Sequence, residues 1–186
     1  MIEARSLIVR ETPFTVTKPF LCQWHYLHCT PRTARLSLGI WHKEEHKESC
    51  RGGHTIVSEQ LVGAILFGQP IARLEDQVHT MELTRMYLLD ECGRNSESYC
   101  IGRAIRLLRT KFPEIHRLIA YSDLGAGHRG IVYAATGWTA VGQSKPGAKG
   151  WDNKWHRPIK NIEDPTAPVR VYSTAVKIKW EKLLIP

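Results

Sequence analysis

Between residues 81 and 142 the sequence alternates several times between the patterns that mark strands and helices. Residues 81–88 (MELTRMYL) and 117–122 (RLIAYS) are short, mainly apolar runs typical of buried strands. The intervening residues 96–112 instead repeat apolar side chains at helical spacing. A strand followed by a helix and another strand predicts a mixed α/β sheet that is flanked by helices.

The remainder of the chain extends this alternation. Further strands are expected at residues 5–9, 35–41, 60–67, 138–142 and 169–179, and further helices at 15–27 and 129–136. We find no repeat and no linker, so a single domain over residues 1–186 is predicted. Residues 42–55 are expected to form an exposed loop, and residues 143–168 a basic and aromatic loop.

The charge of the chain favours a polyanionic partner. Lys and Arg number 26 against 18 Asp and Glu, which gives a formal net charge of +8. Nucleic acid is the first expectation for such a balance, and the alternative is a domain that happens to be basic.

Cysteine content and apolar runs indicate the compartment. The number of cysteines is odd, and their spacing forms no paired C-x-x-C sets, which argues against a secreted disulfide framework. The first residues, MIEARSLIVRETPF, do not resemble a signal peptide, and the longest apolar run, residues 61–67, is too short to cross a bilayer. A cytoplasmic protein without a membrane partner is predicted.

Several short motifs follow one another in a specific order. They are Glu82-Leu83-Thr84-Arg85, Asn95 to Ser98, Tyr121-Ser122-Asp123, Gly127-His128-Arg129-Gly130, Tyr133-Ala134-Ala135 and Gly137-Trp138, with His25-Tyr26 upstream. Over about residues 20–145 this order resembles the phage Mom proteins, which form part of the GNAT-like acyltransferase superfamily.

The resemblance implies a GNAT-like fold and a specific activity. Mom proteins convert adenine in phage DNA to N6-carbamoylmethyladenine, which protects the DNA from host restriction. The implied partners are double-stranded DNA with a flipped adenine and an acyl donor, acetyl-CoA or a related carrier. Iron is also implied, and the compartment would be the host cell cytoplasm.

The expected donor site differs from that of ordinary GNAT enzymes. The usual Gln/Arg-x-x-Gly-x-Gly/Ala phosphate loop is absent, and the chain reads GRNSESYCIGRA instead. Hydroxyls, backbone amides at a helix start and guanidinium groups can still hold phosphates. The predicted donor-binding residues are Arg94, Asn95, Ser96, Ser98 and Arg103.

Four residues are predicted to act in catalysis. Asp123 follows a strand and opens a Gly-rich turn, so it is a candidate general base, or else an Asx-turn or helix cap. Tyr133 is a general acid by resemblance, or a packed aromatic residue. Arg85 lies on a central strand and either contacts an anion or forms an ion pair with Asp123 or Glu82. His128 acts in acid–base chemistry or is a surface residue.

Metal-capable side chains are densest near residue 25. If residues 15–28 are helical, Cys22, His25, Tyr26 and Cys29 share one face, and imidazole and phenolate suit iron. By resemblance, His25 and Tyr26 are the predicted iron ligands. The alternative is a helix face that packs into the core.

Basic and aromatic residues also gather in the C-terminal part. The predicted DNA-binding residues are Lys149, Trp151, Lys154, Trp155 and Arg157, which can follow phosphates and fill the gap left by an extracted base. A solvated loop held by its tryptophans is the alternative. Arg103, Arg106 and Arg109 can equally be the solvent face of a helix.

Three other function classes compete with DNA modification. The first is a GNAT N-acetyltransferase that uses acetyl-CoA to modify an amine of a small molecule or protein. The second is a DNA-binding module with no activity, which the polar residues between positions 82 and 133 disfavour. The third is a metal-dependent nuclease, which would need clustered carboxylates, whereas those in this chain are scattered.

Overall fold

The fold is described from a computed structural model of the 186-residue chain. The structure describes residues 1–47, 55–144, 150–152, 157–159, 169–171 and 176–184, with side chains for 1–44, 57–144 and 176–184. The chain divides into two compact units, Met1–Ile119 with Lys182–Pro186, and Ala120–Glu181. A single domain over residues 1–186 remains a prediction.

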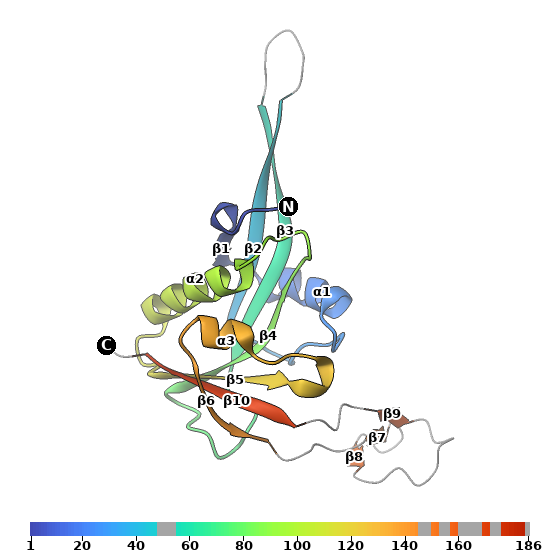
Figure 1. Cartoon of the computed structure of the whole chain (residues 1–186), viewed down its shortest axis with the longest axis vertical. Helices are drawn as coiled ribbons and strands as arrows, with labels where there is room; N and C mark the ends of the chain where they lie inside the picture. Colours follow the sequence, from blue (N-terminus) through green and yellow to red (C-terminus); the bar gives the residue numbers. More distant parts are fainter. Residues whose placement is uncertain (48–54, 145–149, 153–156, 160–168, 172–175, 185–186) are drawn as a thin grey trace. The chain divides into compact units, whose positions relative to one another are not determined.

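The secondary structure follows the predicted alternation (Figure 1). The elements up to β5 are η1 (Ala4–Ser6), β1 (Ile8–Glu11), α1 (Phe14–Trp24), β2 (Leu36–Lys47), β3 (Thr55–Gly68), β4 (Thr80–Leu88), α2 (Ser96–Lys111) and β5 (Arg117–Asp123). After β5 come η2 (Leu124–Ala126), α3 (Ile131–Ala135), β6 (Thr139–Gln143), β7 (Gly150–Asp152), β8 (Arg157–Ile159), β9 (Val169–Val171) and β10 (Lys177–Leu183).

Seven of the strands form one mixed sheet in the order β1-β2-β3-β4-β5-β10-β6. The pairs β1–β2, β2–β3 and β3–β4 are antiparallel, and β6 pairs antiparallel with β10. Three short strands form a second sheet in the order β8-β7-β9. The predicted fold class, an α/β fold with a GNAT-like mixed sheet and flanking helices, is confirmed.

The inner parts of β2 and β3, residues 36–40 and 62–67, are buried on both faces, which explains why the run at residues 61–67 is almost entirely apolar. On one face Leu36 lies opposite Phe67 and Leu38 opposite Ile65, and all four side chains are fully buried. The other face meets α1, and Figure 1 shows α1 and α2 on opposite sides of these two strands.

Helix α1 packs on the sheet through a mixture of apolar and polar contacts. Leu21 forms a cluster with Ala64 and Leu66 of β3. One turn earlier, the buried Thr17 hydroxyl lies 2.7 Å from the hydroxyl of Ser37 on β2, so each satisfies the other. This pair ties the helix to a defined position along β2.

Helix α2 spans Ser96–Lys111, one residue shorter than the predicted 96–112. Its apolar side faces inward, and Cys100, Ile101, Ala104, Ile105 and Leu108 are buried. A glutamate in the first turn and basic residues in the last turn complement the helix dipole. No helix within the described residues is long and apolar enough to span a membrane.

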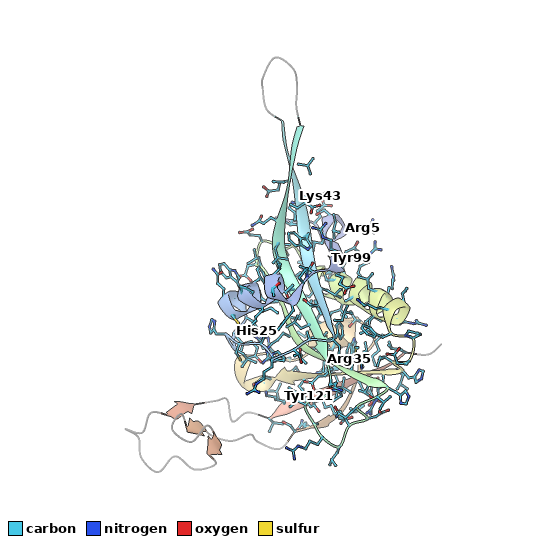
Figure 2. The ribbon with its side chains drawn as sticks, turned by 180° about the vertical axis from the view of Figure 1, so that it is seen from behind. Arg5, His25, Arg35, Lys43, Tyr99 and Tyr121 are labelled. Carbon is cyan, nitrogen blue, oxygen red and sulfur yellow. The ribbon has the colours of Figure 1, made fainter. Side chains whose placement is uncertain are left out.

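Residues 42–47, predicted as part of a loop, continue β2 and pair with residues 55–60 of β3. The two strands form a ribbon that projects beyond the other strands of the first unit (Figure 1). Figure 2 shows Lys43 on this ribbon, at the opposite end of β2 from Arg35. Residues 42–47 look like a loop in the sequence because strands that lie away from the core need no alternation of apolar residues. Their backbone N–H and C=O groups are instead satisfied by the hydrogen bonds between the two strands.

Candidate active site

Strand β4 of the first unit has a β-bulge beside Arg85. Two consecutive residues of β3, Leu66 and Phe67, lie opposite positions 85 and 83 of β4, which leaves Thr84 as an extra residue. The Thr84 hydroxyl donates a hydrogen bond to the carbonyl oxygen of Leu66 over 3.2 Å. Bulges bend a strand, redirect its side chains and are frequent beside functional sites.

The guanidinium group of Arg85 anchors the segment that follows α1. Its Nε donates to the carbonyl oxygen of Cys29 over 3.0 Å, and its Nη1 to the carbonyl oxygen of Thr84 over 2.6 Å. Its Nη2 lies 3.8 Å from the Cys29 sulfur. All these acceptors are neutral, and Arg85 has no carboxylate partner among the described residues.

The ion pair with Glu82 that the sequence left open is therefore not formed. The buried Glu82 carboxylate instead accepts a hydrogen bond from the backbone N–H of Ile71 over 2.9 Å. Arg85 combines an anchoring contact with an uncompensated positive charge, which can attract an anion.

The predicted metal-binding helix face does not form, because α1 ends at Trp24 and His25 has an extended backbone. Aromatic residues and His have modest helix propensity, and Cys29 follows in a non-helical segment in which His28 has a positive φ of 47°. The spacing that places Cys22, His25, Tyr26 and Cys29 on one face requires a continuous helix.

The side chains of the predicted iron ligands do not fit a metal site as they lie. The rings of His25 and Tyr26 stack with centroids 4.5 Å apart, and the Nδ1 of buried His25 accepts the backbone N–H of Leu27 over 3.1 Å. Figure 2 shows His25 beside the faint blue ribbon of the α1 region. The part of the chain with described side chains holds no group of three His, Cys, Asp or Glu that could bind a metal.

The predicted donor-binding residues gather at the start of α2. The helix cap is Asn95, which adopts the left-handed conformation with φ 66°. No described side chain caps this end, and the first N–H groups of any α-helix have no acceptor within the helix. The first of them, the Ser96 N–H, donates to the Gly93 carbonyl oxygen over 3.2 Å, so the N–H groups that follow it are the ones open to an anion. Such an end is suited to bind an anion.

The side chains at this helix end differ in what they can contact. Ser96 is fully buried, and its hydroxyl has no hydrogen-bond partner among the residues that the structure describes. The Ser98 hydroxyl donates to the Asn95 carbonyl oxygen over 2.9 Å. Arg94 is exposed. The Arg103 guanidinium lies 3.1 Å from the hydroxyl of Tyr99. Backbone amides and Arg94 are therefore better placed for a phosphate than the Ser96 hydroxyl.

Asp123 ends β5 in the second unit and is only 2% exposed. Its Oδ1 accepts the backbone N–H of Gly125 over 2.9 Å, and its Oδ2 lies 3.9 Å from the Lys177 ammonium. The cap expected as the alternative role of Asp123 is thus present. A carboxylate can accept several hydrogen bonds at once, so a cap is compatible with a catalytic role.

Tyr133 on α3 lies between two tryptophans of the second unit. Its ring centroid is 5.3 Å from that of Trp138 and 5.7 Å from that of Trp180. The Trp180 Nε1 donates to the buried Ser122 hydroxyl over 2.9 Å. Gly130 makes room for this arrangement, because a Cβ there would lie 2.3 Å from the Trp180 ring.

His128 lies in the exposed turn after η2, where its backbone N–H donates to the Asp123 carbonyl oxygen over 3.0 Å. Gly127 and Gly130 bracket this turn with positive φ values of 77° and 76°. The same turn therefore links His128 to the aspartate, while its catalytic role remains a prediction.

The predicted DNA-binding residues lie mainly outside the described part of the chain. Lys149, Lys154 and Trp155 fall outside it. Trp151 and Arg157 belong to β7 and β8, whose described backbones pair antiparallel. Their role in DNA binding stays a prediction.

Two features of the structure were missed by sequence reasoning. Ser122 and Trp180 are far apart in the chain, and only the adjacency of Ser122 to Asp123 could have drawn attention to it. The second feature is a cavity of about 300 Å³ in the first unit, which lies between the segment after α1 and the segment after β3. It is lined by Pro31, Arg32, Thr33, Ala34, Arg35, Gly68, Gln69, Ile71 and Thr84.

Solved structures define the class of fold. An acetyltransferase of the GNAT family from Streptococcus pneumoniae has a TM-score of 0.55 and 11% identity, and the match covers 96% of this chain and 99% of that one. A ribosomal-protein-S5-alanine acetyltransferase from Vibrio fischeri has a TM-score of 0.55 and 14% identity, with 96% and 93% of the chains covered. A putative acetyltransferase from Salmonella typhimurium, solved with its cofactor acetyl-CoA, has a TM-score of 0.55 and 11% identity, with 97% and 95% covered. The fold is that of the GNAT acetyltransferases.

Sequence comparison identifies the family within that class. The profile of the Mom protein family matches residues 6–170, and the chain belongs to this family. A curated relative, the methylcarbamoylase Mom of Escherichia phage Mu, is 30% identical over 92 residues. That alignment covers 50% of this chain and 38% of the relative.

Proposed function

We propose that this protein is a transferase that modifies DNA by converting adenine to N6-carbamoylmethyladenine, and that this modification protects phage DNA from restriction in the host cytoplasm. Membership of the Mom family is the observation that carries the proposal. The printed name of the phage Mu relative, a methylcarbamoylase, supports the type of group transferred.

An acyl-CoA or a related carrier is the donor in this proposal. The GNAT-like fold supports it, and the similar enzyme from Salmonella typhimurium was solved with acetyl-CoA. Within this chain, the uncapped start of α2 offers backbone N–H groups to a phosphate, and exposed Arg94 adds positive charge. Asn95, Ser98 and Arg103 complete the proposed contact surface.

Acid–base chemistry is assigned to the second unit. The exocyclic N6 of adenine is a weak nucleophile because its lone pair is delocalised into the ring, so a group that accepts its proton accelerates attack. We assign that role to buried Asp123, with Tyr133 as the proton donor to the leaving group and His128 as an assisting residue of the same turn. Arg85 is assigned to an anionic group of donor or DNA.

Direct acyl transfer alone does not give the proposed product, N6-carbamoylmethyladenine. Attack of an amine on a thioester gives an amide, whereas carbamoylmethyladenine carries an N-alkyl group. The reaction therefore includes a further step. Iron enters no step here, since His25 and Tyr26 do not form a metal site in this structure.

DNA must present the adenine outside the base stack, because N6 is paired and stacked inside a duplex. The net charge of +8 supports binding to the phosphate backbone. Lys149, Trp151, Lys154, Trp155 and Arg157 remain proposed contacts to the strand.

Mass spectrometry of nucleosides from DNA of cells that express the protein tests the proposal. We expect a deoxyadenosine whose mass is increased by one carbamoylmethyl group. The matched variant is Asp123→Asn, whose amide oxygen can still accept the Gly125 N–H while the negative charge is lost. The modified nucleoside should fall by about 100-fold or more with this variant, the range typical of a lost general base.

Other outcomes separate the alternatives. A deoxyadenosine adduct of a different mass would support DNA modification but would show that another group, from another donor, is transferred. Unmodified DNA from cells with abundant folded protein would contradict the proposal and favour an N-acetyltransferase that acts on another amine. If the Asp123→Asn variant modified DNA as fully as the wild type, Asp123 would not be the general base.

A further inference from the structure

Lys177 of β10 faces the buried carboxylate of Asp123 within the second unit. Its Nζ lies 3.9 Å from the Oδ2 of Asp123, while Oδ1 accepts the Gly125 N–H. At this distance the two charges attract each other, but they do not form a hydrogen bond. Within the part of the chain that the structure describes, the Lys177 ammonium donates no hydrogen bond. Its three N–H donors therefore lie beside the proposed general base and can serve a ligand.

The backbone of Lys177 is fixed by Ser144, the residue that follows β6. The Ser144 N–H donates to the Lys177 carbonyl oxygen over 2.8 Å, and the Lys177 N–H donates to the Ser144 hydroxyl over 3.1 Å. These bonds prolong the pairing of β6 with β10, in which Ile178 lies opposite Gln143. The sheet thus sets the position from which the lysine side chain extends.

The two charged side chains differ in their access to solvent. The Asp123 side chain is 3% exposed, whereas that of Lys177 is 40% exposed. A lysine stem is flexible enough to make room for a ligand, because four carbons separate its ammonium from the backbone. A ligand group that reaches Oδ2 of Asp123 therefore meets the Lys177 ammonium beside it.

A carboxylate beside an ammonium matches a ligand edge on which a hydrogen-bond donor lies next to an acceptor. On the major-groove edge, adenine presents this combination through its N6 amino group and N7. Guanine presents two acceptors there, and cytosine presents a donor without the ring nitrogen. Asparagine and glutamine read adenine through the same edge with a single amide. Asp123 and Lys177 divide the accepting and donating roles between two side chains.

We propose that Lys177 is a specificity-determining residue that donates a hydrogen bond to N7 of the adenine, while Oδ2 of Asp123 accepts one from N6. The inference rests on the proposed function, because it names a second group that recognises the acceptor base in the second unit. A positive group at N7 draws electron density from the exocyclic nitrogen, so the N6 proton passes more easily to Asp123. The same two contacts select the base and activate it.

Replacement of single atoms in DNA tests this contact apart from the chemical step. The probes are single-stranded oligothymidines with one central adenine, 7-deazaadenine or 1-deazaadenine, in which no duplex has to open. 7-Deazaadenine lacks the N7 acceptor, whereas 1-deazaadenine keeps both N6 and N7. Fluorescence anisotropy gives the dissociation constants, and their ratio cancels the contribution of the phosphate backbone, which the three probes share.

We expect the wild type to bind the adenine probe about tenfold more tightly than the 7-deazaadenine probe, the effect of a hydrogen bond from a charged donor. The 1-deazaadenine probe should bind as the adenine probe does. Lys177→Met keeps the length of the side chain without its ammonium and should abolish the preference, whereas Lys177→Arg should restore part of it. Lys179→Met removes one charge from the same strand and should keep the wild-type ratio.

The proposal is overturned if Lys177→Met keeps the preference for N7, or if Lys179→Met loses it to the same degree. Weaker binding of 1-deazaadenine with full binding of 7-deazaadenine would also overturn it, because another edge of the base would then be read. If the wild type binds the three probes equally while the DNA of expressing cells carries the adduct, only this inference fails. If the wild type binds none of them and that DNA is unmodified, the proposed function fails as well.

Discussion

The Trp180 indole N–H donates to the Ser122 hydroxyl over 2.9 Å, and both side chains are buried in the second unit. Ser122→Ala leaves this N–H without its partner, and an unsatisfied buried donor costs about 1–3 kcal/mol. We expect the free energy of unfolding, measured in urea, to fall by that amount. The exposed Ser58→Ala is the control, and an equal effect of both substitutions would contradict the importance of the hydrogen bond.

Gly130 is expected to tolerate no side chain. Its φ of 76° is unfavourable for other residues, and a Cβ would lie 2.3 Å from the Trp180 ring. Gly130→Ala should lower the free energy of unfolding by about 2–5 kcal/mol, through left-handed strain and overpacking together. Thermal unfolding followed by circular dichroism measures the loss. A melting temperature equal to that of the wild type would show that the contact is not maintained in solution.

Gly102 is expected to respond in the opposite way. It lies within α2, and a Cβ at this position would meet no atom within 4 Å. Gly102→Ala should raise the free energy of unfolding by about 0.5–1 kcal/mol, because alanine restricts the unfolded chain and favours helix. The same denaturation experiment detects the gain, and destabilisation would mean that α2 packs more closely there than the structure indicates.

Ionisation of the Cys100 thiol makes the free energy of unfolding depend on pH in the alkaline range. Burial is the main cause that raises the pKa of its thiol from 9.0 to about 12, with smaller effects of Cys92 and Glu97. Because the unfolded thiol ionises first, its stabilising contribution is complete below pH 9.0 and is lost as the pH rises toward about 12. Cys100→Ala should flatten the decline of unfolding free energy over this interval, and an unchanged decline would assign it to other groups.

The stability of the protein should depend on the shape of the side chain at position 85 as well as on its charge. Arg85→Lys retains the positive charge but cannot reach the carbonyl oxygens of Cys29 and Thr84 with one rigid fork. We expect the free energy of unfolding to fall by about 1–3 kcal/mol, as for hydrogen bonds from charged donors. Arg106→Ala should change it by no more than about 0.5 kcal/mol, the usual limit for a surface site. Equal stability of Arg85→Lys and the wild type would refute the anchoring role.

Local pattern was enough to predict much of this protein. The apolar spacing of residues 96–112 predicted α2, because side chains three and four residues apart share a helix face whatever the rest of the chain does. The almost continuous apolar run at residues 60–67 predicted a buried strand, and β3 is buried there from residue 62 to residue 67. The order of short motifs from His25 to Trp138 indicated the Mom family, and the match over residues 6–170 confirmed it.

Other outcomes depended on contacts that no local pattern encodes. The end of α1 at Trp24 separated the four residues of the predicted metal-binding face, since that face existed only while the helix continued. The polar residues 42–47 became a strand because β3 supplied backbone partners for them.

The sequence by itself determined the alternation of helices and strands, the fold class and the family, because these depend on the spacing of residue types along the chain. Only the tertiary structure decided that Arg85 holds Cys29, that Ser122 meets Trp180 across 58 positions, and that residues 31–35 line an open cavity together with Gly68, Gln69 and Ile71. Contacts between distant segments follow from the packing of the sheet, which determines which side chains come within hydrogen-bonding distance.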